Sequence, residues 1–508
     1  MEIKGTTYSL YHYEKYSETN NKNIFEEVID MMMLDEVNES LHDKIKDLPI
    51  SEKRMNILAF LEKNRNMFLK IKEIIKNNNF DKKEHITEIV KMLREYVKVS
   101  PTERRNFGEV MTPTDLITDT LNKLPKEVWS NPNLKWLDAC NGVGPFLCLV
   151  IYGLMKGLSK WQKNPELRYK HIIENMIFSG EIQPTNVFLY LCAVDPNDEY
   201  DVNVFCGDFL SEGFDKHNKE VFNVEKYDII VGNPPFDSPQ KAKGKRGGGK
   251  TLWDKFVLKY IDMLKPNGYL ALVHPTLWRK PQSKRSASRL VNETMMKKQF
   301  NYIEMHNSDD GLKTFNAGTR YDFYVMENCP IYKETVINGE DRKDVKVDLR
   351  NYDFIPNYNL ELFDKLIAKS NDDKCPIIFN RTNYGTDKKW VFNEKNEEFK
   401  YTLIHSTPKK GTRYMYSSRN DKGHFDIPKV IFGDSGIYDV IIDMEGEYGM
   451  TQHSMAIEVS TIEEAKYIKK ALLSKNFNEF LKTAMWSNFQ IDWRLFMYLK
   501  KEFWKEFI

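Results

Sequence analysis

Cysteine, net charge and long apolar runs are all scarce in this chain of 508 residues. Only six cysteines occur and no two are spaced as Cys-x-x-Cys, so buried free thiols are favoured over a disulfide framework or a zinc site. Lys and Arg (75) nearly balance Asp and Glu (74), whereas a protein that coats phosphate backbone non-specifically would be more basic. Any positive charge used to bind nucleic acid must therefore be local.

Signals for a membrane or for export are also lacking. The longest apolar stretch, near residues 146–155, is shorter than the roughly 18 residues needed to span a bilayer. The first five residues lack the basic-then-apolar pattern of a signal peptide. We therefore expect a soluble, cytoplasmic protein of two or three domains.

The pattern of apolar and polar residues changes twice along the chain. Residues 1–100 carry apolar residues at helical spacing, such as Phe25, Val28 and Met32, and predict a helical region. Residues 101–345 alternate short apolar runs with helix-length segments, which predicts a doubly wound, mainly parallel α/β sheet of the Rossmann-like kind. Residues 346–508 read as a separate mixed α/β domain. The expected strands are 134–138, 176–181, 202–206, 227–232, 269–274 and 321–326.

Acidic residues follow successive strands of this sheet. Asp138 ends the first and is followed by a turn with Gly142 and Gly144, which lets a ligand approach the backbone and opens a helix. Glu181 ends the second strand, where a carboxylate accepts hydrogen bonds from ribose hydroxyls. Asp208 follows the third. Each acid alone is typical of a cap or a solvated loop, but their serial placement favours an adenosine pocket.

The fourth strand runs into Asn233, Pro234, Pro235 and Phe236. Two prolines stop the sheet and remove two N–H donors, which leaves a rigid corner with carbonyls, an amide and an aromatic ring. Two acceptors there suit a planar amine, because accepting both of its N–H bonds favours a tetrahedral nitrogen that can attack a methyl group. A plain proline-rich turn is the alternative interpretation.

These motifs together resemble the amino-methylating DNA adenine methyltransferases of restriction–modification systems, with the motif order of the gamma class. The resemblance covers residues 101–330 and implies S-adenosylmethionine as cofactor, with Asn233–Phe236 as the catalytic motif. It implies a target-recognition role for residues 346–508. It also implies a cofactor site formed by Thr112, Pro113, Asp138, Asn141, Gly142, Gly144, Phe146, Glu181, Ile182, Asp208 and Phe209. Asn141 departs from the family, which usually has Cys at this position.

Two weaker features concern the substrate. Phe315 lies where related enzymes carry a second aromatic against the extruded base, and a simple core phenylalanine is equally compatible with the sequence. Lys243, Lys245 and Arg246 belong to a basic, glycine-rich segment directly after the catalytic motif. Such a segment is usually just solvated, but beside an active site it also suits DNA phosphates.

The resemblance implies that double-stranded DNA is bound, that one adenine is rotated out of the duplex, and that no metal or membrane is involved. A separate endonuclease or another subunit, bound through the N-terminal helices, is a possible partner. Two alternatives remain open. One is methylation of RNA or of protein glutamine, and the other is an inactive methylase fold that only binds nucleic acid.

Overall fold

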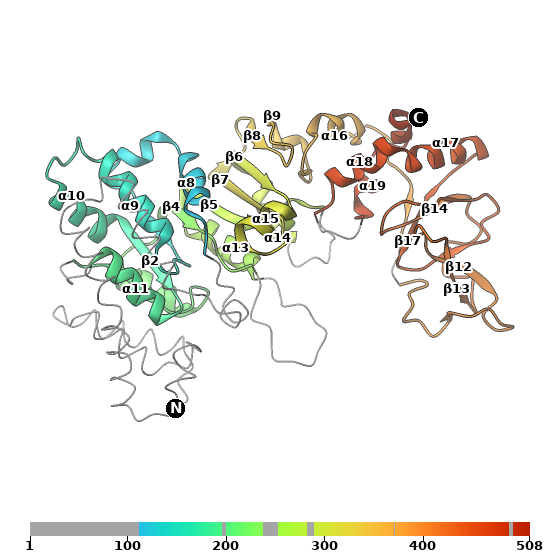
Figure 1. Cartoon of the computed structure of the whole chain (residues 1–508), viewed down its shortest axis with the longest axis horizontal. Coiled ribbons are helices and arrows are strands. Elements are labelled where there is room, and N and C mark those ends of the chain that lie inside the picture. The colour runs from blue at the N-terminus through green and yellow to red at the C-terminus, as the bar shows by residue number, and fades with distance from the viewer. Residues whose placement is uncertain are drawn as a thin grey trace, which may run out of the picture. The chain divides into compact units, whose positions relative to one another are not determined.

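The computed structural model describes residues 111–195, 200–236, 252–281, 289–369, 371–380, 382–486 and 491–508. The helical region expected in residues 1–100 lies outside these ranges. The described chain divides into two compact units (Figure 1). The first unit holds residues 111–275, 289–338 and 346–351, and the second holds 276–281, 339–345 and 352–508. Residues 276–281 thus belong with the second unit, although the sequence grouped them with the catalytic domain.

A nine-stranded sheet forms the first unit, in the order β3-β2-β1-β4-β5-β7-β6-β8-β9. The five strands from β3 to β5 are parallel to one another, whereas β7 is antiparallel to both β5 and β6. The α/β class with a mainly parallel sheet, expected from the sequence, is confirmed. The strands are β1 Trp136–Asp138, β2 Ile177–Glu181, β3 Asn203–Cys206, β4 Tyr227–Gly232, β5 Leu264–Pro275, β6 Lys298–His306, β7 Tyr321–Pro330, β8 Thr335–Asn338 and β9 Asp344–Val347.

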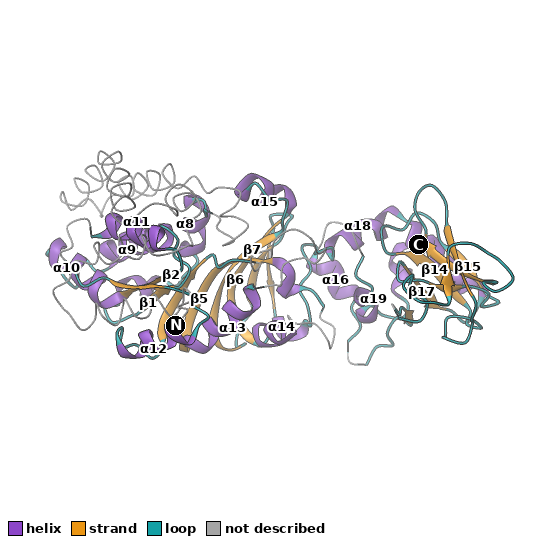
Figure 2. Ribbon diagram, turned by 90° about the horizontal axis from the view of Figure 1, so that it is seen from below, coloured by secondary structure: helices purple, strands orange, loops and turns teal. Residues whose placement is uncertain are grey.

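Helices cover both faces of this sheet, so the central strands are apolar throughout. Figure 2 shows α8, α9 and α11 on one face and α12, α13 and α14 on the other. In β4, every residue except Asp228 is buried. The helices of this unit are α8 Thr114–Asn122, α9 Pro145–Gly157, α10 Pro165–His171, α11 Pro184–Val194, α12 Glu212–Glu220, α13 Trp253–Met263, α14 Arg289–Met295 and α15 Ser308–Phe315.

The sequence missed β6, β8 and β9 and started β5 five residues late. The burial of β6 does not alternate, because single half-buried residues separate pairs of buried ones over most of the strand. Its register against β7 also shifts twice, between Lys298 and Gln299 and between Phe300 and Tyr302. Because these bulges break the period of two, the strand does not appear as an alternating pattern.

The second unit contains two four-stranded sheets, ordered β10-β17-β14-β15 and β11-β13-β12-β16. They pack through a small cluster formed by Ile404, Ile431, Met450 and Ala456. Aromatic residues near the end of the described chain, including Trp486, Phe496 and Phe503, contribute to a larger core. The elements are β10 Ile377–Ile378, β11 Val391–Phe392, β12 Tyr401–Ser406, β13 Arg413–Ser417, β14 Lys429–Gly433, β15 Ile441–Asp443, β16 Gly449–Met450, β17 Ser454–Glu458, α16 Leu360–Leu366, α17 Ile462–Leu473, α18 Lys475–Thr483 and α19 Arg494–Tyr498.

Two side-chain hydrogen bonds cap the start of α17. The Thr461 hydroxyl accepts a hydrogen bond from the backbone N–H of Glu464 over 3.1 Å. The Glu464 carboxylate in turn accepts from the N–H of Ser460 over 2.8 Å. None of the helices in the described ranges is both long and apolar enough to cross a membrane.

Candidate active site

The carboxyl ends of β1, β2, β3 and β4 meet at one edge of the sheet because these strands are parallel and in close register. Asp138 pairs with Ser179, and Glu181 pairs with Cys206. Backbone bonds extend this edge past the strands, from Asn141 N–H to Gly180 O over 3.0 Å and from Gly207 N–H to Glu181 O over 2.8 Å. The structure therefore brings together the acidic residues that the sequence placed after successive strands.

The turn after β1 depends on its two glycines. Gly142 and Gly144 have φ of +56° and +94°, in the region that side chains with a Cβ rarely adopt. A Cβ on Gly144 would also lie 2.3 Å from the Tyr190 ring, whereas open space surrounds the corresponding position of Gly142. Phe146, two residues into α9, belongs to the hydrophobic core. The turn thus presents backbone to a ligand at Gly142 and anchors itself at Gly144.

Glu181 fixes this turn from the neighbouring strand. One carboxylate oxygen, Oε2, accepts a hydrogen bond from Gly142 N–H over 2.8 Å. The other, Oε1, accepts from Gln183 N–H over 2.9 Å. The Glu181 carboxylate therefore holds the turn after β1 through one oxygen and the end of its own strand through the other. Ile182, between these contacts, is exposed.

Asp138 is fully buried behind the turn and accepts a hydrogen bond from Cys140 N–H over 3.0 Å. Burial raises the pKa of this carboxyl to about 8, and the nearby Glu181 adds to the rise, although the Cys140 bond opposes it. The last residue of β4, Gly232, has φ of +146°, and a Cβ there would lie 2.8 Å from Asp138 Oδ1. Glycine at this position lets the end of β4 lie against the turn.

Asn233 follows Gly232, and its amide is oriented by the segment before α8. The Asn233 Nδ2 group donates a hydrogen bond to Thr112 Oγ1 over 3.0 Å. Thr112 is buried, and Pro113 is the N-cap residue of α8. Nδ2 is the donor of the Asn233 amide and is engaged in this bond. The amide's acceptor, Oδ1, takes no part in it.

The catalytic motif is tied at its far end to α13. The Phe236 carbonyl accepts hydrogen bonds from the N–H groups of Leu252 and Trp253, over 3.1 and 3.3 Å. Among the described residues, none donates a hydrogen bond to the carbonyl of Pro234. The motif therefore offers two acceptors at a corner held from both sides, the Asn233 amide oxygen and the Pro234 carbonyl.

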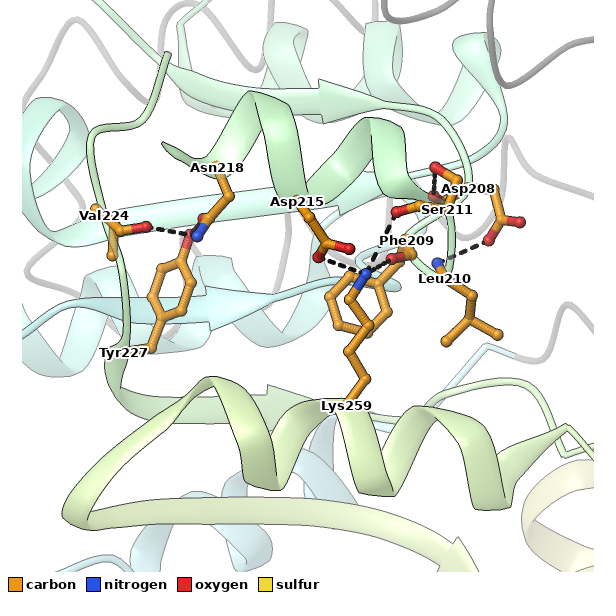
Figure 3. A network of polar contacts seen from close by, with 9 residues as sticks. All are labelled: Asp208, Phe209, Leu210, Ser211, Asp215, Asn218, Val224, Tyr227 and Lys259. Atoms are coloured by element: carbon orange, nitrogen blue, oxygen red, sulfur yellow. Dashed lines mark hydrogen bonds and ion pairs between the residues drawn. The ribbon is translucent and has the colours of Figure 1, made fainter. Parts of the chain in front are cut away.

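The loop after β3 is held by a network that the sequence did not reveal (Figure 3). The Lys259 ammonium donates to Phe209 O over 2.7 Å, pairs with Asp215 Oδ1 at 2.6 Å and lies 4.9 Å from the centre of the Phe209 ring. Asp208 Oδ1 accepts from Leu210 N–H over 2.9 Å. Phe209 is buried and stacks on Phe256, with ring centres 5.7 Å apart.

A second part of this network lies beneath the loop. The Tyr227 hydroxyl donates to Asn218 Oδ1, and Asn218 Nδ2 donates to Val224 O over 2.5 Å (Figure 3). These bonds join α12 to the start of β4. No motif marks Lys259 or Asn218 in the sequence, and the loop that Lys259 holds is 50 residues away in the chain.

The edge contains polar atoms that a ligand would satisfy. Asn141 is only 3% exposed, and neither atom of its side-chain amide bonds to another described residue. Buried polar groups of proteins are nearly always paired, so an unpaired amide at the mouth of a glycine turn fits a ligand with both donors and acceptors. The described residues contain no cluster of three or more side chains suited to a metal ion.

Four residues expected near the substrate are placed differently or not described. Phe315 is 8% exposed and packs edge-on against Tyr321 within the core, with ring centres 4.9 Å apart. Lys243, Lys245 and Arg246 lie outside the described residues. Their proposed contacts with DNA therefore remain predictions.

A known protein family matches part of the chain that forms this edge of the sheet. Residues 158–311 match the family model of the Eco57I restriction-modification methylase. The matched segment contains Glu181, Asp208 and the Asn233–Phe236 motif. A protein of Mycoplasma pneumoniae described as an uncharacterized adenine-specific methylase is 30% identical over 235 residues. These matches confirm the resemblance to adenine methylases of restriction–modification systems, while the gamma-class motif order remains a prediction.

The alignments differ in how much of each protein they cover. The Mycoplasma match covers 34% of this chain and 55% of the relative, so the chain spans about half of that protein's length. Among solved structures, the Type IIL restriction-modification enzyme MmeI in complex with DNA is 13% identical to this chain, with a TM-score of 0.47. This match covers 81% of this chain and 70% of the MmeI chain. The DrdV–DNA complex is 10% identical, with a TM-score of 0.47 and coverage of 98% and 64%.

Proposed function

We propose that this chain transfers a methyl group from S-adenosylmethionine to the exocyclic amino nitrogen of an adenine in double-stranded DNA. The observation that carries the proposal is the Asn233 amide, which Thr112 holds over 3.0 Å at the sheet edge formed by Asp138 and Glu181. The match to the Eco57I methylase family supports the same activity.

The cofactor would lie over the turn after β1. When bound, S-adenosylmethionine supplies an electrophilic methyl group on a sulfonium sulfur. The residues that fit it are Asn141, whose amide bonds to no other described residue, Gly142, with open space at its Cβ position, and Glu181, whose carboxylate holds the turn. Asp208, whose Oδ1 accepts a hydrogen bond from Leu210, is assigned to the same site by the resemblance.

Asn233 and Pro234 would act on the substrate amine. The lone pair of the adenine amino nitrogen is delocalised into the ring, so the nitrogen is a poor nucleophile. By accepting both N–H bonds, the Asn233 amide oxygen and the Pro234 carbonyl favour a tetrahedral nitrogen with a localised lone pair. That lone pair forms the new nitrogen–carbon bond, the departing sulfur keeps its bonding electrons, and one amino proton passes to water. Positioning supplies most of the acceleration.

The second unit would provide target recognition, and Phe236 would stack on the flipped base. Because adenine's amino group is buried in pairing within a duplex, the base must leave the stack before it reaches Asn233. A separate endonuclease or another subunit remains a predicted partner of residues 1–100.

Labelled S-adenosylmethionine, incubated separately with duplex DNA, RNA and protein extract, tests the proposal. We expect label in DNA only, on adenine, and none with Asn233→Ala, although that variant should still bind the cofactor. Asn301→Ala, which changes an asparagine of β6 outside the site, provides the matched control. Label in RNA or in protein glutamine would mean that the substrate is not DNA. Absence of cofactor binding would favour a methylase fold that only binds nucleic acid.

A further inference from the structure

A cavity of about 290 Å³ lies in the second unit and is lined by none of the residues that the sequence analysis singled out for chemistry. It forms where β12 ends, the hairpin to β13 begins and the turn after β14 approaches the segment before β17. The residues that line it are His405, Ser406, Thr407, Pro408, Arg413, Gly433, Ser435, Gly436 and His453.

The walls of this cavity are held in place by buried contacts. The Thr407 hydroxyl accepts a hydrogen bond from Gly433 N–H over 3.0 Å, and a Cβ on Gly433 would lie 2.9 Å from that oxygen. Asp434 N–H donates to His453 O over 3.2 Å. Gly436 has φ of +106°, which the tight turn requires. The recess is therefore built into the packing of the two sheets.

Arg413 is a cation at this cavity, and it has no partner among the described residues. Its side chain makes no hydrogen bond or ion pair with any described residue, although it is exposed at the start of β13. Two other arginines of the unit are held by neighbouring carboxylates, Arg419 by Asp421 at 2.5 Å and Arg494 by Asp492 at 2.8 Å. A guanidinium left unpaired at the rim of a recess is placed to bind an anion in a forked geometry.

The two histidines supply donors to the recess when their rings are protonated. The Thr451 hydroxyl donates to His405 O over 3.3 Å, so its oxygen accepts from His405 Nδ1 at 3.0 Å. The remaining nitrogen, Nε2, is an acceptor in the neutral ring and becomes a donor when the ring is protonated. His453 Nδ1 lies 3.5 Å from Asp434 Oδ2, so Nε2 is the remaining nitrogen of that ring as well. Burial lowers the pKa of His405, and the nearby His453 and Arg413 lower it further, although Asp434 opposes them. The negative charge of a bound anion would offset the effect of these two neighbours and favour the protonated form of His405.

The surroundings of the cavity favour a nucleic-acid backbone over a small anion. Lys409 and Lys410 are exposed on the same hairpin, and Tyr414 and Tyr438 are about half exposed beside it. Lys409 lies 5.2 Å from the centre of the Tyr438 ring. The cavity is larger than one phosphate group needs, so there is room for bridging water or sugar. Cations on this hairpin, with aromatic rings on it and beside it, are typical of contacts to phosphate and sugar.

We propose that this cavity binds a backbone phosphate of duplex DNA, with Arg413 as its main contact and with His405 and His453, in their protonated form, as supporting donors. The inference rests on the proposed function, because it assigns to the second unit a contact with the same DNA. The lining residues include no carboxylate that would repel a phosphate, and the neighbouring Asp434 carboxylate is engaged by His453 and Ser435.

Titration of fluorescent duplex DNA with the full-length protein at several salt concentrations tests the assignment. We expect Arg413→Ala to weaken binding about tenfold on every duplex and to reduce the slope of log affinity against log salt by about 1. Arg413→Lys should keep the slope, since the charge remains. Arg419→Ala, which removes an exposed arginine outside the cavity, should behave as the wild type.

The outcomes separate this assignment from the proposed function. A wild type that methylates DNA, together with an Arg413→Ala variant of unchanged affinity and slope, would overturn the phosphate site alone. A change in the methylated sequence at unchanged slope would also overturn it, because it would make Arg413 a base-reading residue. A wild type that neither methylates nor binds duplex DNA would overturn the proposed function first.

Discussion

The Asn233 side chain donates a hydrogen bond to the Thr112 hydroxyl over 3.0 Å, although 121 residues separate the two in the chain. The bond joins the segment that leads into α8 to the end of β4. It decides which end of the Asn233 amide is engaged, and so leaves Oδ1 as the acceptor that the proposed chemistry requires. We therefore expect Thr112 to have a positioning role that the resemblance alone does not assign.

Thr112→Val, which keeps the shape but removes the hydroxyl, is expected to lower kcat about tenfold, equivalent to about 1.4 kcal/mol. Because the observed bond goes to Asn233, affinity for S-adenosylmethionine should fall much less. Single-turnover methylation and calorimetric binding measure the two quantities separately. Thr112→Ser should restore most of the rate.

Thr118→Val is the matched control for that experiment. The Thr118 hydroxyl bonds only within α8, to Thr114 O over 2.8 Å, so the rate should not change. If Thr112→Val weakens cofactor binding as much as it slows methyl transfer, Thr112 acts on the cofactor and the positioning role is wrong.

Asn141→Ala should raise the dissociation constant for S-adenosylmethionine about tenfold and leave the stability of the ligand-free protein within about 1 kcal/mol. The reason is that the Asn141 amide is buried and bonds to no other described residue, so the substitution removes no hydrogen bond seen in the ligand-free protein. Asn218→Ala offers the contrast, because Asn218 bonds both Tyr227 and Val224. It should cost about 1–3 kcal/mol of unfolding free energy. Equal stability losses in the two variants would mean that Asn141 has a structural role.

The sequence predicted those parts of the site that follow directly from single strands. Asp138, Glu181 and Asn233 each follow an apolar run, and the parallel sheet brings such positions to one edge whatever the loops between them do. The strand 227–232 was predicted with its exact bounds because its apolar run ends at two prolines.

What the sequence did not predict depends on contacts between distant segments. Lys259 lies in a helix whose pattern indicates only core packing, yet its ammonium holds the backbone of the loop after β3. The strand β6 was missed because bulges break its period. The burial of Phe146 and Phe209 likewise depends on which helices cover the sheet, and no motif specifies that.

Raising the pH from 6 to 9 should destabilise the first unit through Asp138. Burial raises its pKa to about 8 from its ordinary value of 3.8, so between these values the folded state binds a proton that the unfolded state does not. This contribution to stability is complete below pH 3.8 and is lost as the pH rises through 8. Between pH 6 and 8 the loss should be about 2 kcal/mol.

Chemical unfolding at several pH values, compared with Asp138→Asn, measures that loss. The amide does not ionise, so the variant should lack the decline above pH 6 that is due to this group. The same slope in both proteins would show that the Asp138 carboxyl is ionised in the folded state.

A buried ion pair should dominate the electrostatics of the second unit. Lys429 and Asp443 are 0% and 2% exposed, and their Nζ and Oδ2 atoms lie 2.6 Å apart. Asp443 also accepts hydrogen bonds from the N–H groups of Glu447 and Tyr448, over 2.8 and 3.0 Å. Lys429→Met would leave this carboxylate buried and without its cation, so we expect a loss of about 3–5 kcal/mol of unfolding free energy.

Lys482→Met is the control, since Lys482 pairs with Glu479 at 2.7 Å with both side chains more than half exposed. Its loss should stay below about 1 kcal/mol, because solvent screens an exposed pair. Denaturant titration followed by tryptophan fluorescence measures both variants, and Trp486 and Trp504 in the core of this unit report on its unfolding. If Lys429→Met and Lys482→Met are equally mild, the Asp443 carboxylate takes up a proton when its partner is removed. Stability of Lys429→Met would then fall with rising pH, which distinguishes this case from a weak pair.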